Sequence, residues 1–177
     1  GISTGWDNGD GSYSFRPYAE VARCDMAAFL YRMAGSPAFE PTAQQRAAFR
    51  DVDESTPHAR EVWWLAAQGI SSGWTEADGS ATFHPYETVK RCDMAAFLYR
   101  LAGKTELSAA VSGPPFTDVD ASTPHADAVL WLASNKVSQG WQESNGTWTF
   151  RPYVTVKRAD MAAFLHRMDE KGLVDKA

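Results

Sequence analysis

The sequence predicts a mainly α-helical protein built from tandem helix-loop-helix repeats, with short β-hairpins in the loops. Two observations support this fold class. First, three segments of the chain match one another, and the hexapeptide Asp-Met-Ala-Ala-Phe-Leu is identical in all three. Second, two of these segments have apolar residues at helical spacing on both sides of a loop that contains Asp-Gly or Asn-Gly. Self-similarity at a fixed period is typical of repeat architectures.

The repeat recurs with a period of 68 and then 67 residues, which the tryptophans Trp6, Trp74 and Trp141 mark. On this period the chain divides into the second half of repeat one (1–35), repeat two (49–103) and repeat three (116–168). Linkers at 36–48 and 104–115 separate the repeats, and a polar C-terminal tail covers 169–177. Repeat one lacks the front half that begins at Phe49 and at Phe116 in the other copies. Because stacked repeats share a core, we predict that this half lies upstream in a longer parent chain.

The front half of each complete repeat is predicted to form a helix. In repeat two it begins at residues 55–57, where Ser-Thr-Pro offers a hydroxyl cap followed by proline at the first helical position. Apolar residues then recur at helical spacing, and Gly69 suits a left-handed end to the helix. In repeat three the start is at residues 123–124, and Lys136 stands where repeat two has its glycine.

The second half of each repeat is predicted to form a hairpin and a second helix. Pairs such as Asp78-Gly79 favour a tight turn, because both residues tolerate positive φ. The helix is expected from near Val89 to just before Gly103, with an apolar stripe at i, i+3, i+4 and i+7. Asp93 lies in its first turn, where the helix dipole favours an acid.

The composition is that of a globular protein, with 44% hydrophobic and 22% charged residues. A net charge of −5 without basic runs argues against binding to nucleic acid or to anionic membrane surfaces. No apolar run has the length of a membrane span, and the start of the sequence shows no signal-peptide pattern. Cys24 and Cys92 do not form a CxxC pair, and we expect two reduced thiols and no cofactor.

The order of these motifs resembles the repeat of the S-layer homology domain family. That repeat has an opening Phe-x-Asp-Val, a helix ending in Gly-Ile, a Gly-rich turn leading to Phe-x-Pro, and a second helix opening with Thr-Arg-Ala-Glu. The corresponding residues of repeat two are Phe49-Arg50-Asp51-Val52, Gly69-Ile70, Asp78-Gly79, Phe83-His84-Pro85 and Lys90-Arg91-Cys92-Asp93. Repeat three shows the same order from Phe116 to Asp160, so the resemblance covers nearly all of the chain outside the linkers.

This resemblance implies three tandem repeats around a pseudo-threefold axis, which anchor a secreted protein non-covalently to the cell wall or cell surface of a Gram-positive bacterium. The ligands that it implies are secondary cell-wall polymers, often with acidic sugars, bound in grooves between repeats. The arginine of the Thr-Arg-Ala-Glu motif is among the family's binding residues. With the acid of that motif, it corresponds here to Arg23, Arg91, Arg158, Asp25, Asp93 and Asp160.

The sequence departs from the family pattern in two places. The threonine of the motif is replaced by Ala22, Lys90 and Lys157, so its hydroxyl cap is lost. A tryptophan that the family often carries at the start of the first helix is replaced by Pro57 and Pro124, and with it a ligand contact. In these departures the chain resembles variant repeats of secreted actinobacterial cell-wall proteins and hydrolases.

The three motif arginines can act in either of two ways. A guanidinium group suits bidentate contacts to a carboxylate or phosphate on a glycan, and the neighbouring Lys90 and Lys157 favour an anion site. The same arginines can instead pair with the acid two residues further along, or with a neighbouring repeat. The sequence leaves both interpretations open.

Tryptophans are the candidate surfaces for stacking on sugars. For Trp6, Trp74 and Trp141 we favour a plug between the loop and the two helices, since large aromatic residues usually anchor cores. Trp64 and Trp131 lie just outside the apolar stripe of the front helix. They are the better candidates for a sugar platform, although packing between helices is the stronger interpretation.

The recurring histidines and acids do not predict a metal site. His58 and His125 accompany Asp51 and Asp118, but two ligands without a third make a poor metal site. The acidic loop at residues 7–11 loses its spaced oxygens in the other copies, and we interpret it as a plain turn rather than a calcium loop.

These observations predict a non-catalytic module that anchors its parent protein to a cell-wall glycan. The polar residues that stand out recur with the repeat, whereas a catalytic centre needs one acid, one base and one geometry. A protein-docking module is the alternative, and a fragment of a glycan-active enzyme is the third hypothesis. Weak binding in two or three linked grooves would add up through effective concentration.

Overall fold

The protein folds mainly into helices, with short antiparallel hairpins between them, as the sequence predicts. The computed structural model describes residues 2–103 and 116–176. Its helices are α1 (Arg23–Met33), α2 (Ala43–Arg46), α3 (Ala59–Ala67), α4 (Arg91–Leu101), α5 (Ala126–Ser134) and α6 (Arg158–Glu170). Its strands are β1 (Trp6–Asp7), β2 (Tyr13–Ser14), β3 (Trp74–Thr75), β4 (Ala81–Thr82), β5 (Trp141–Gln142) and β6 (Trp148–Thr149).

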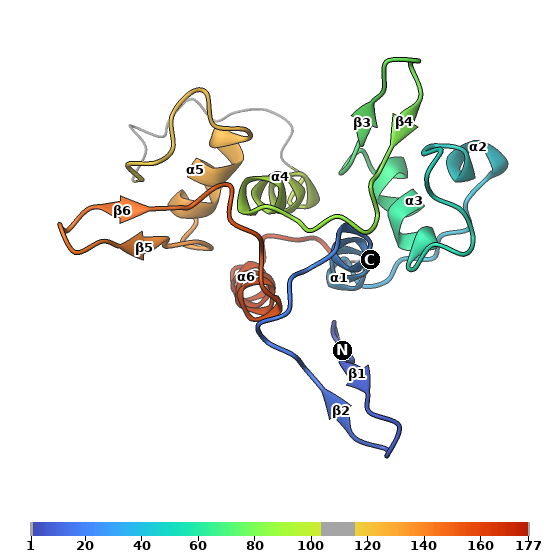
Figure 1. Cartoon of the computed structure of the whole chain (residues 1–177), viewed down its shortest axis with the longest axis horizontal. Coiled ribbons are helices and arrows are strands. Elements are labelled where there is room, and N and C mark those ends of the chain that lie inside the picture. The colour runs from blue at the N-terminus through green and yellow to red at the C-terminus, as the bar shows by residue number, and fades with distance from the viewer. Residues whose placement is uncertain (1, 104–115, 177) are drawn as a thin grey trace.

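The second helices of the three repeats, α1, α4 and α6, surround the centre of the molecule, and the three hairpins project outward from it (Figure 1). The front helix α3 packs on α1, and the front helix α5 packs on α4. Each front helix therefore covers the second helix of the preceding repeat. This exchange of helices interlocks the repeats into one structure with a shared core.

A ring of backbone hydrogen bonds joins the three repeats at the centre. The amide of Val21 donates to the carbonyl of Val156 at 3.0 Å, Val156 donates to Val89 at 2.9 Å, and Val89 donates back to Val21 at 2.9 Å. All three valines are buried. Each lies two positions before the first residue of a second helix, so the closed ring marks the pseudo-threefold axis that the family resemblance implies.

The front helices begin later than the sequence predicts. Thr56 does not cap a helix, because its hydroxyl accepts a hydrogen bond from the amide of Asp53 at 3.1 Å. The Asp53 carboxylate in turn accepts from the amide of Ser55 at 2.8 Å. This local turn uses up the hydroxyl groups, and α3 starts only after His58, whose φ is 60°. Repeat three repeats the arrangement, with His125 at φ 58° before α5.

The ends of the front helices agree with the prediction. Gly69 follows α3 with a φ of 67°, and the amide of the next residue bonds back to the carbonyl of Leu65 at 2.9 Å. Lys136 takes the same left-handed conformation after α5, with a φ of 55°. The amide of Val137 bonds to the carbonyl of Leu132, also at 2.9 Å, so the lysine performs the role of the glycine.

The hairpins form as the Asp-Gly and Asn-Gly pairs predict. In repeat two Trp74 pairs with Thr82, and Gly79 has a φ of 81° at the turn. The Asp78 carboxylate accepts the amide of Ser80 at 3.0 Å, which closes the tip. The second helix that follows, α4, begins two residues after the expected start and ends before Gly103 as predicted.

One predicted linker and the predicted C-terminal tail carry structure of their own. The predicted linker at residues 36–48 contains α2, whose start is capped reciprocally by the side chains of Thr42 and Gln45. The predicted linker at residues 104–115 lies outside the described residues. In the predicted polar tail, Val174 is buried and Leu173 packs against the core. Apolar burial thus extends beyond the last repeat motif.

The two cysteines, Cys24 and Cys92, are free thiols buried at equivalent positions in α1 and α4. Burial raises the pKa of each thiol to about 11. Within the described part of the chain, no helix has the length and apolar character needed to cross a bilayer.

Candidate functional site

Three equivalent pockets lie between the repeats. Pocket A lies beside Trp6, pocket B beside Trp74 and pocket C beside Trp141. Each is lined by the motif arginine of one repeat and by the tryptophan, aspartate, phenylalanine and a second arginine of the following repeat. Their cavity volumes are about 160, 150 and 210 Å³. Pockets for drug-sized ligands start at about 300 Å³, so each of these suits one small unit, such as a single sugar residue.

The motif arginines Arg23, Arg91 and Arg158 are buried and form one wall of each pocket. In pocket B the Nε of Arg23 donates to the carbonyl of Phe83 at 2.7 Å, and its guanidinium carbon lies 4.1 Å from the Trp74 ring centroid. Arg23 belongs to repeat one, whereas both partners belong to the hairpin region of repeat two. The arginine therefore ties neighbouring repeats together and also faces a pocket, which combines features of both interpretations made from the sequence.

The other two arginines repeat this geometry. Arg91 donates from Nε to the carbonyl of Phe150 at 2.8 Å and lies 4.3 Å from the Trp141 ring centroid. Arg158 donates to the carbonyl of Phe15 at 2.9 Å and lies 4.1 Å from the Trp6 ring centroid. The same side chain therefore has the same partners at all three junctions.

Burial lowers the pKa of these guanidinium groups, but they keep their positive charge at neutral pH. It lowers the pKa of Arg23 and of Arg91 to about 10. The carboxylates of Asp93 and Asp160 oppose this effect, because each lies in the same pocket as the arginine of the preceding repeat. Burial also lowers the pKa of Arg158. With a pKa of about 10, Arg23 and Arg91 are cationic at neutral pH.

The sequence-based interpretation of Trp6, Trp74 and Trp141 as core plugs is wrong. Trp74 is 41% exposed, and it lies flat against the Arg23 guanidinium and edge-on to His84, with ring centroids 4.7 Å apart. The core position is taken instead by Phe83, which is fully buried against Phe49. The smaller phenylalanine fills the space between hairpin and helices, so the tryptophan is left at the rim of the pocket.

The predicted sugar platforms Trp64 and Trp131 lie elsewhere. Trp64 is buried edge-on against Tyr31, with ring centroids 5.3 Å apart. Trp131 contacts Tyr99 in the same way, at 5.5 Å. Neither tryptophan lines pocket A, B or C. Both pack a front helix onto the second helix of the preceding repeat, the alternative that the sequence favoured.

The two motif lysines also lie outside the pockets. Lys90 and Lys157 are the residues that precede α4 and α6. The Nζ of Lys157 bonds to the carboxylate of Glu20 at 2.8 Å, which joins repeats one and three at the surface. This hydrogen bond is the main cause that lowers the pKa of Glu20. Lys157 thus serves the junction between repeats, and the structure does not bring it to the anion site that the sequence suggests.

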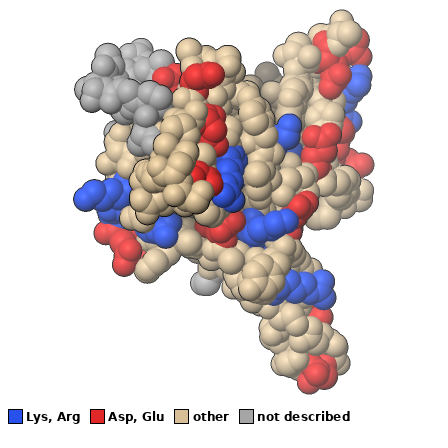
Figure 2. Space-filling model, turned by 60° about the vertical axis from the view of Figure 1, so that its left-hand side comes forward, with Lys and Arg blue, Asp and Glu red and all other residues tan. Residues whose placement is uncertain are grey.

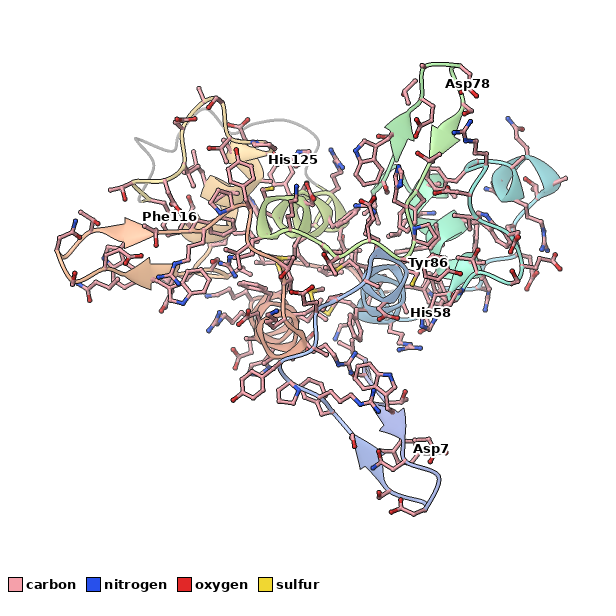
Figure 3. The ribbon with its side chains drawn as sticks, viewed as in Figure 1. Asp7, His58, Asp78, Tyr86, Phe116 and His125 are labelled. Atoms are coloured by element: carbon pink, nitrogen blue, oxygen red, sulfur yellow. The ribbon has the colours of Figure 1, made fainter. Side chains whose placement is uncertain are left out.

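The three motif aspartates do lie in the pockets, and histidines face two of them. The Nε2 of His58 is 3.6 Å from the carboxylate of Asp25 in pocket A, and that of His125 is 3.8 Å from Asp93 in pocket B. Figure 3 labels both histidines, beside α1 and α4 respectively. Each histidine belongs to the front half of one repeat, and the aspartate that it faces belongs to the preceding repeat. Burial, followed by the charge of Arg100, lowers the pKa of His125.

The strained backbone of these histidines aims their rings at the pockets. Positive φ is uncommon for residues with a Cβ, and such strain concentrates at functional sites. His58 and His125 both adopt it immediately before a helix, at φ 60° and 58°. We therefore regard the two rings as part of the pockets rather than as ordinary helix caps.

A second arginine that was not among the predicted site residues lines each pocket. Arg32, Arg100 and Arg167 line pockets A, B and C. Each donates from Nη1 to a backbone carbonyl at the end of its own repeat's front segment, at 3.0 to 3.1 Å. The signal was present, because each follows its motif arginine by nine residues in every copy. Each pocket thus holds two arginines and one aspartate, a net positive site that suits an anionic group.

Pocket C differs from the other two. Its lining contains Arg91, Arg167, Asp160 and Trp141, but no histidine among the described residues. In pockets A and B the histidine comes from the front half of the next repeat. For pocket C the corresponding segment would be the front half of repeat one, which the sequence does not contain.

The described residues offer no cluster of three or more histidine, cysteine, aspartate or glutamate side chains that could hold a metal ion. In the acidic loop at residues 7–11, Asp7 accepts the amide of Gly9 at 2.8 Å and Asp10 accepts the amide of Ser12 at 2.9 Å. These carboxylates stabilise the turn. On the face shown in Figure 2, basic and acidic side chains lie next to one another near the middle of the molecule, as the mixed charge of the pockets requires.

The fold and these pockets define a class of protein: a pseudo-threefold repeat protein whose pockets are formed between neighbouring repeats. Residues 115–162 match the S-layer homology domain family. This match covers most of repeat three. Repeat two carries the same motifs at equivalent positions, and repeat one carries those of the second half.

Two curated proteins of Acetivibrio thermocellus are similar to the chain. A cellulosome-anchoring protein is 23% identical over 166 residues, which cover 92% of this chain and 35% of the relative. Cell surface glycoprotein 1 is 23% identical over 173 residues, which cover 93% of this chain and 7% of the relative. The chain therefore spans about a third of one relative and a small part of the other. The similarity is not specific to actinobacterial proteins.

Proposed function

We propose that this domain is a non-catalytic anchor that holds a larger protein at the bacterial cell surface by binding an anionic cell-wall glycan in pockets A, B and C. The observation that carries the proposal is the recurrence of one arrangement: two arginines, an aspartate and a tryptophan in one pocket, three times around one axis. A repeating polymer presents the same chemical unit many times, and three equivalent sites match such a ligand.

The chemistry of each pocket supports this ligand class. Guanidinium groups donate charge-assisted hydrogen bonds to carboxylate or phosphate groups. The tryptophan offers an apolar face and edge at the pocket rim, which suits contact with the C–H surface of a sugar. A cavity of about 150 Å³, as in pocket B, admits one sugar residue and not a folded partner. Weak binding at each pocket would be raised by effective concentration along the polymer.

The names of the two relatives support the location. One is a cellulosome-anchoring protein and the other a cell surface glycoprotein. By analogy, this domain acts outside the cell, at the wall or surface of a Gram-positive bacterium, as part of a longer parent chain. A secreted wall hydrolase of the actinobacterial kind is one such parent. Binding, rather than catalysis, is the function that recurring polar residues serve best.

The test is retention on purified Gram-positive cell walls, before and after acid removes the polymers other than peptidoglycan. The informative variant combines Arg32→Gln with Arg100→Gln. These arginines line pockets A and B but, unlike Arg23, do not stack between three aromatic rings. The control combines Arg46→Gln with Arg50→Gln, which removes two exposed arginines from surface ion pairs.

We expect intact walls to retain the wild type and the control, and stripped walls to retain neither. Losing one charge-assisted hydrogen bond costs about 1.5–3 kcal/mol, so the pocket variant should bind at least about tenfold more weakly. Binding that survives stripping would identify peptidoglycan as the ligand. Equal binding by the pocket variant and the control would refute the role of the pockets.

Docking to another protein is the second candidate, and a specific surface favours it. Tyr18, Tyr86 and Tyr153 follow proline in each repeat and are all exposed, with Tyr18 reaching 85%. Exposed tyrosines are typical of interfaces. Absence of binding to both wall preparations, together with concentration-dependent self-association in light scattering, would favour this function.

A further inference from the structure

Two of the three pockets hold a titratable ring among their fixed charges. His58 lines pocket A and His125 lines pocket B, and the two side chains are 32% and 38% exposed (Figure 3). Their Nε2 atoms lie 3.6 and 3.8 Å from the carboxylates of Asp25 and Asp93. Both distances exceed that of a good hydrogen bond, so each ring can still bind a ligand that enters its pocket from solvent.

The charges that face each ring come from two second helices. In pocket A, the aspartate is joined by Arg32 from α1 and Arg158 from α6. In pocket B, it is joined by Arg100 from α4 and Arg23 from α1. With a neutral histidine, each pocket therefore contains two positive groups and one negative group.

The front helices themselves oppose a positive charge on the histidines. Each histidine immediately precedes a front helix, whose dipole places partial positive charge beside the ring. The acids of the first turns, Glu61 in α3 and Asp127 in α5, line neither pocket A nor pocket B. Burial, followed by the charge of Arg100, lowers the pKa of His125. Without a ligand, the His125 ring is therefore neutral at neutral pH.

An anionic group in the pocket reverses this balance. It would lie beside the two arginines and next to the histidine that line the same small cavity. An opposite charge within about 4–6 Å favours the protonated form of an imidazole. Because such coupling is reciprocal, a ligand that favours the protonated ring is itself bound more tightly once the ring is protonated.

We propose that His58 and His125 bind the anionic group of the glycan in their protonated form, so that the domain holds the cell wall more tightly at acidic than at neutral pH. This inference rests on the proposed function and makes the proton a second ligand of the same pockets. Binding at pocket A or B takes up to one proton from solvent, which adds to the ring nitrogen that lacks a hydrogen. Pocket C, lined by no histidine among the described residues, lacks this dependence.

The test is retention on purified Gram-positive cell walls at about pH 7.5 and about pH 5.5, at constant ionic strength. The variant combines His58→Asn with His125→Asn, because asparagine tolerates positive φ and does not titrate in this range. The control is His166→Asn, which removes an exposed histidine that lines neither pocket. Circular dichroism checks that each protein is folded at both pH values. Calorimetry of the wild type with acid-released wall polymer, in buffers of different ionisation enthalpy, counts the protons taken up and needs no variant.

We expect the wild type and the control to bind at least about fivefold more tightly at the lower pH, and the double variant to change by less than about twofold. The double variant also reports any pH dependence that comes from the wall itself. Equal binding by the wild type at the two pH values, the same pH dependence in the double variant, or binding without proton uptake would overturn this inference and leave the proposed function standing. Absence of retention at both pH values would overturn the two together.

Discussion

The aspartate of the Phe-x-Asp-Val motif should contribute strongly to stability, and Asp118→Ala tests this. Its two carboxylate oxygens accept the amides of Phe150 and Arg151, both at 2.7 Å. These bonds connect the front half of repeat three to the residues that follow its hairpin, 32 and 33 positions away. Arg151 is held at a φ of 59°, a conformation that the second bond helps to fix.

The expected cost follows from the two bonds. A hydrogen bond to a charged group contributes about 1.5–3 kcal/mol, and the aspartate is exposed, so water replaces part of the loss. We expect Asp118→Ala to lower the free energy of unfolding by about 2–4 kcal/mol. Asp118→Asn keeps one acceptor oxygen and should cost about 1–2 kcal/mol.

Urea denaturation followed by circular dichroism measures both values. Glu40→Ala is the control, because Glu40 is exposed and its replacement should change stability by less than about 0.5 kcal/mol. A loss below about 1 kcal/mol for Asp118→Ala, or equal losses for the Ala and Asn variants, would refute the reasoning. The first result would show that water satisfies the two amides equally well.

Three further predictions concern the turns, the pockets and the thiols. Gly140→Ala should lower the free energy of unfolding, measured in urea, by at least about 2 kcal/mol, because its new Cβ would lie 2.5 Å from the Phe116 ring at a φ of 68°. Gly146→Ala has open space around it and should lower that free energy by about 1 kcal/mol. Similar losses for the two variants would contradict the steric argument. Burial lowers the pKa of His125, so the contribution of this group to stability is present above the unfolded pKa of about 6.5 and is lost as pH falls. The free energy of unfolding should therefore decrease from about pH 7.5 to about pH 5. The decrease should be smaller in His125→Gly, because glycine tolerates the positive φ at this position. Cys24 and Cys92, with pKa values of about 11, should react with a thiol reagent far more slowly in the folded protein than in denaturant, and equal rates would show that they are accessible.

The sequence was sufficient to predict the repeat architecture, because period and apolar spacing are properties of the chain itself. It failed at the starts of the front helices. Thr56 is an acceptable helix cap by residue type, but the neighbouring Asp53 binds it into a turn. Nothing in the local pattern indicated that His58 would adopt a left-handed conformation.

The pockets could be predicted only in part for the same reason. Arg91 and Asp160 were recognised as candidates one at a time, but they come together from different repeats. Trp74 was assigned to the core because the sequence could not show that Phe83 fills that space. Arg100 could have been found, since it recurs at a fixed distance from the motif arginine in every repeat.

The pockets also link ligand binding to closure of the whole ring of repeats. Pocket A takes Arg158 from repeat three, Trp6 from repeat one and His58 from repeat two, so no single repeat can form it. The ring itself closes through the bond from Val21 to Val156, which are far apart in the sequence. A ligand in pocket A therefore binds only the closed form, and it stabilises that form by RT ln(1 + [L]/Kd). If, as proposed, one polymer occupies several pockets, the domain should gain stability from the wall to which it binds.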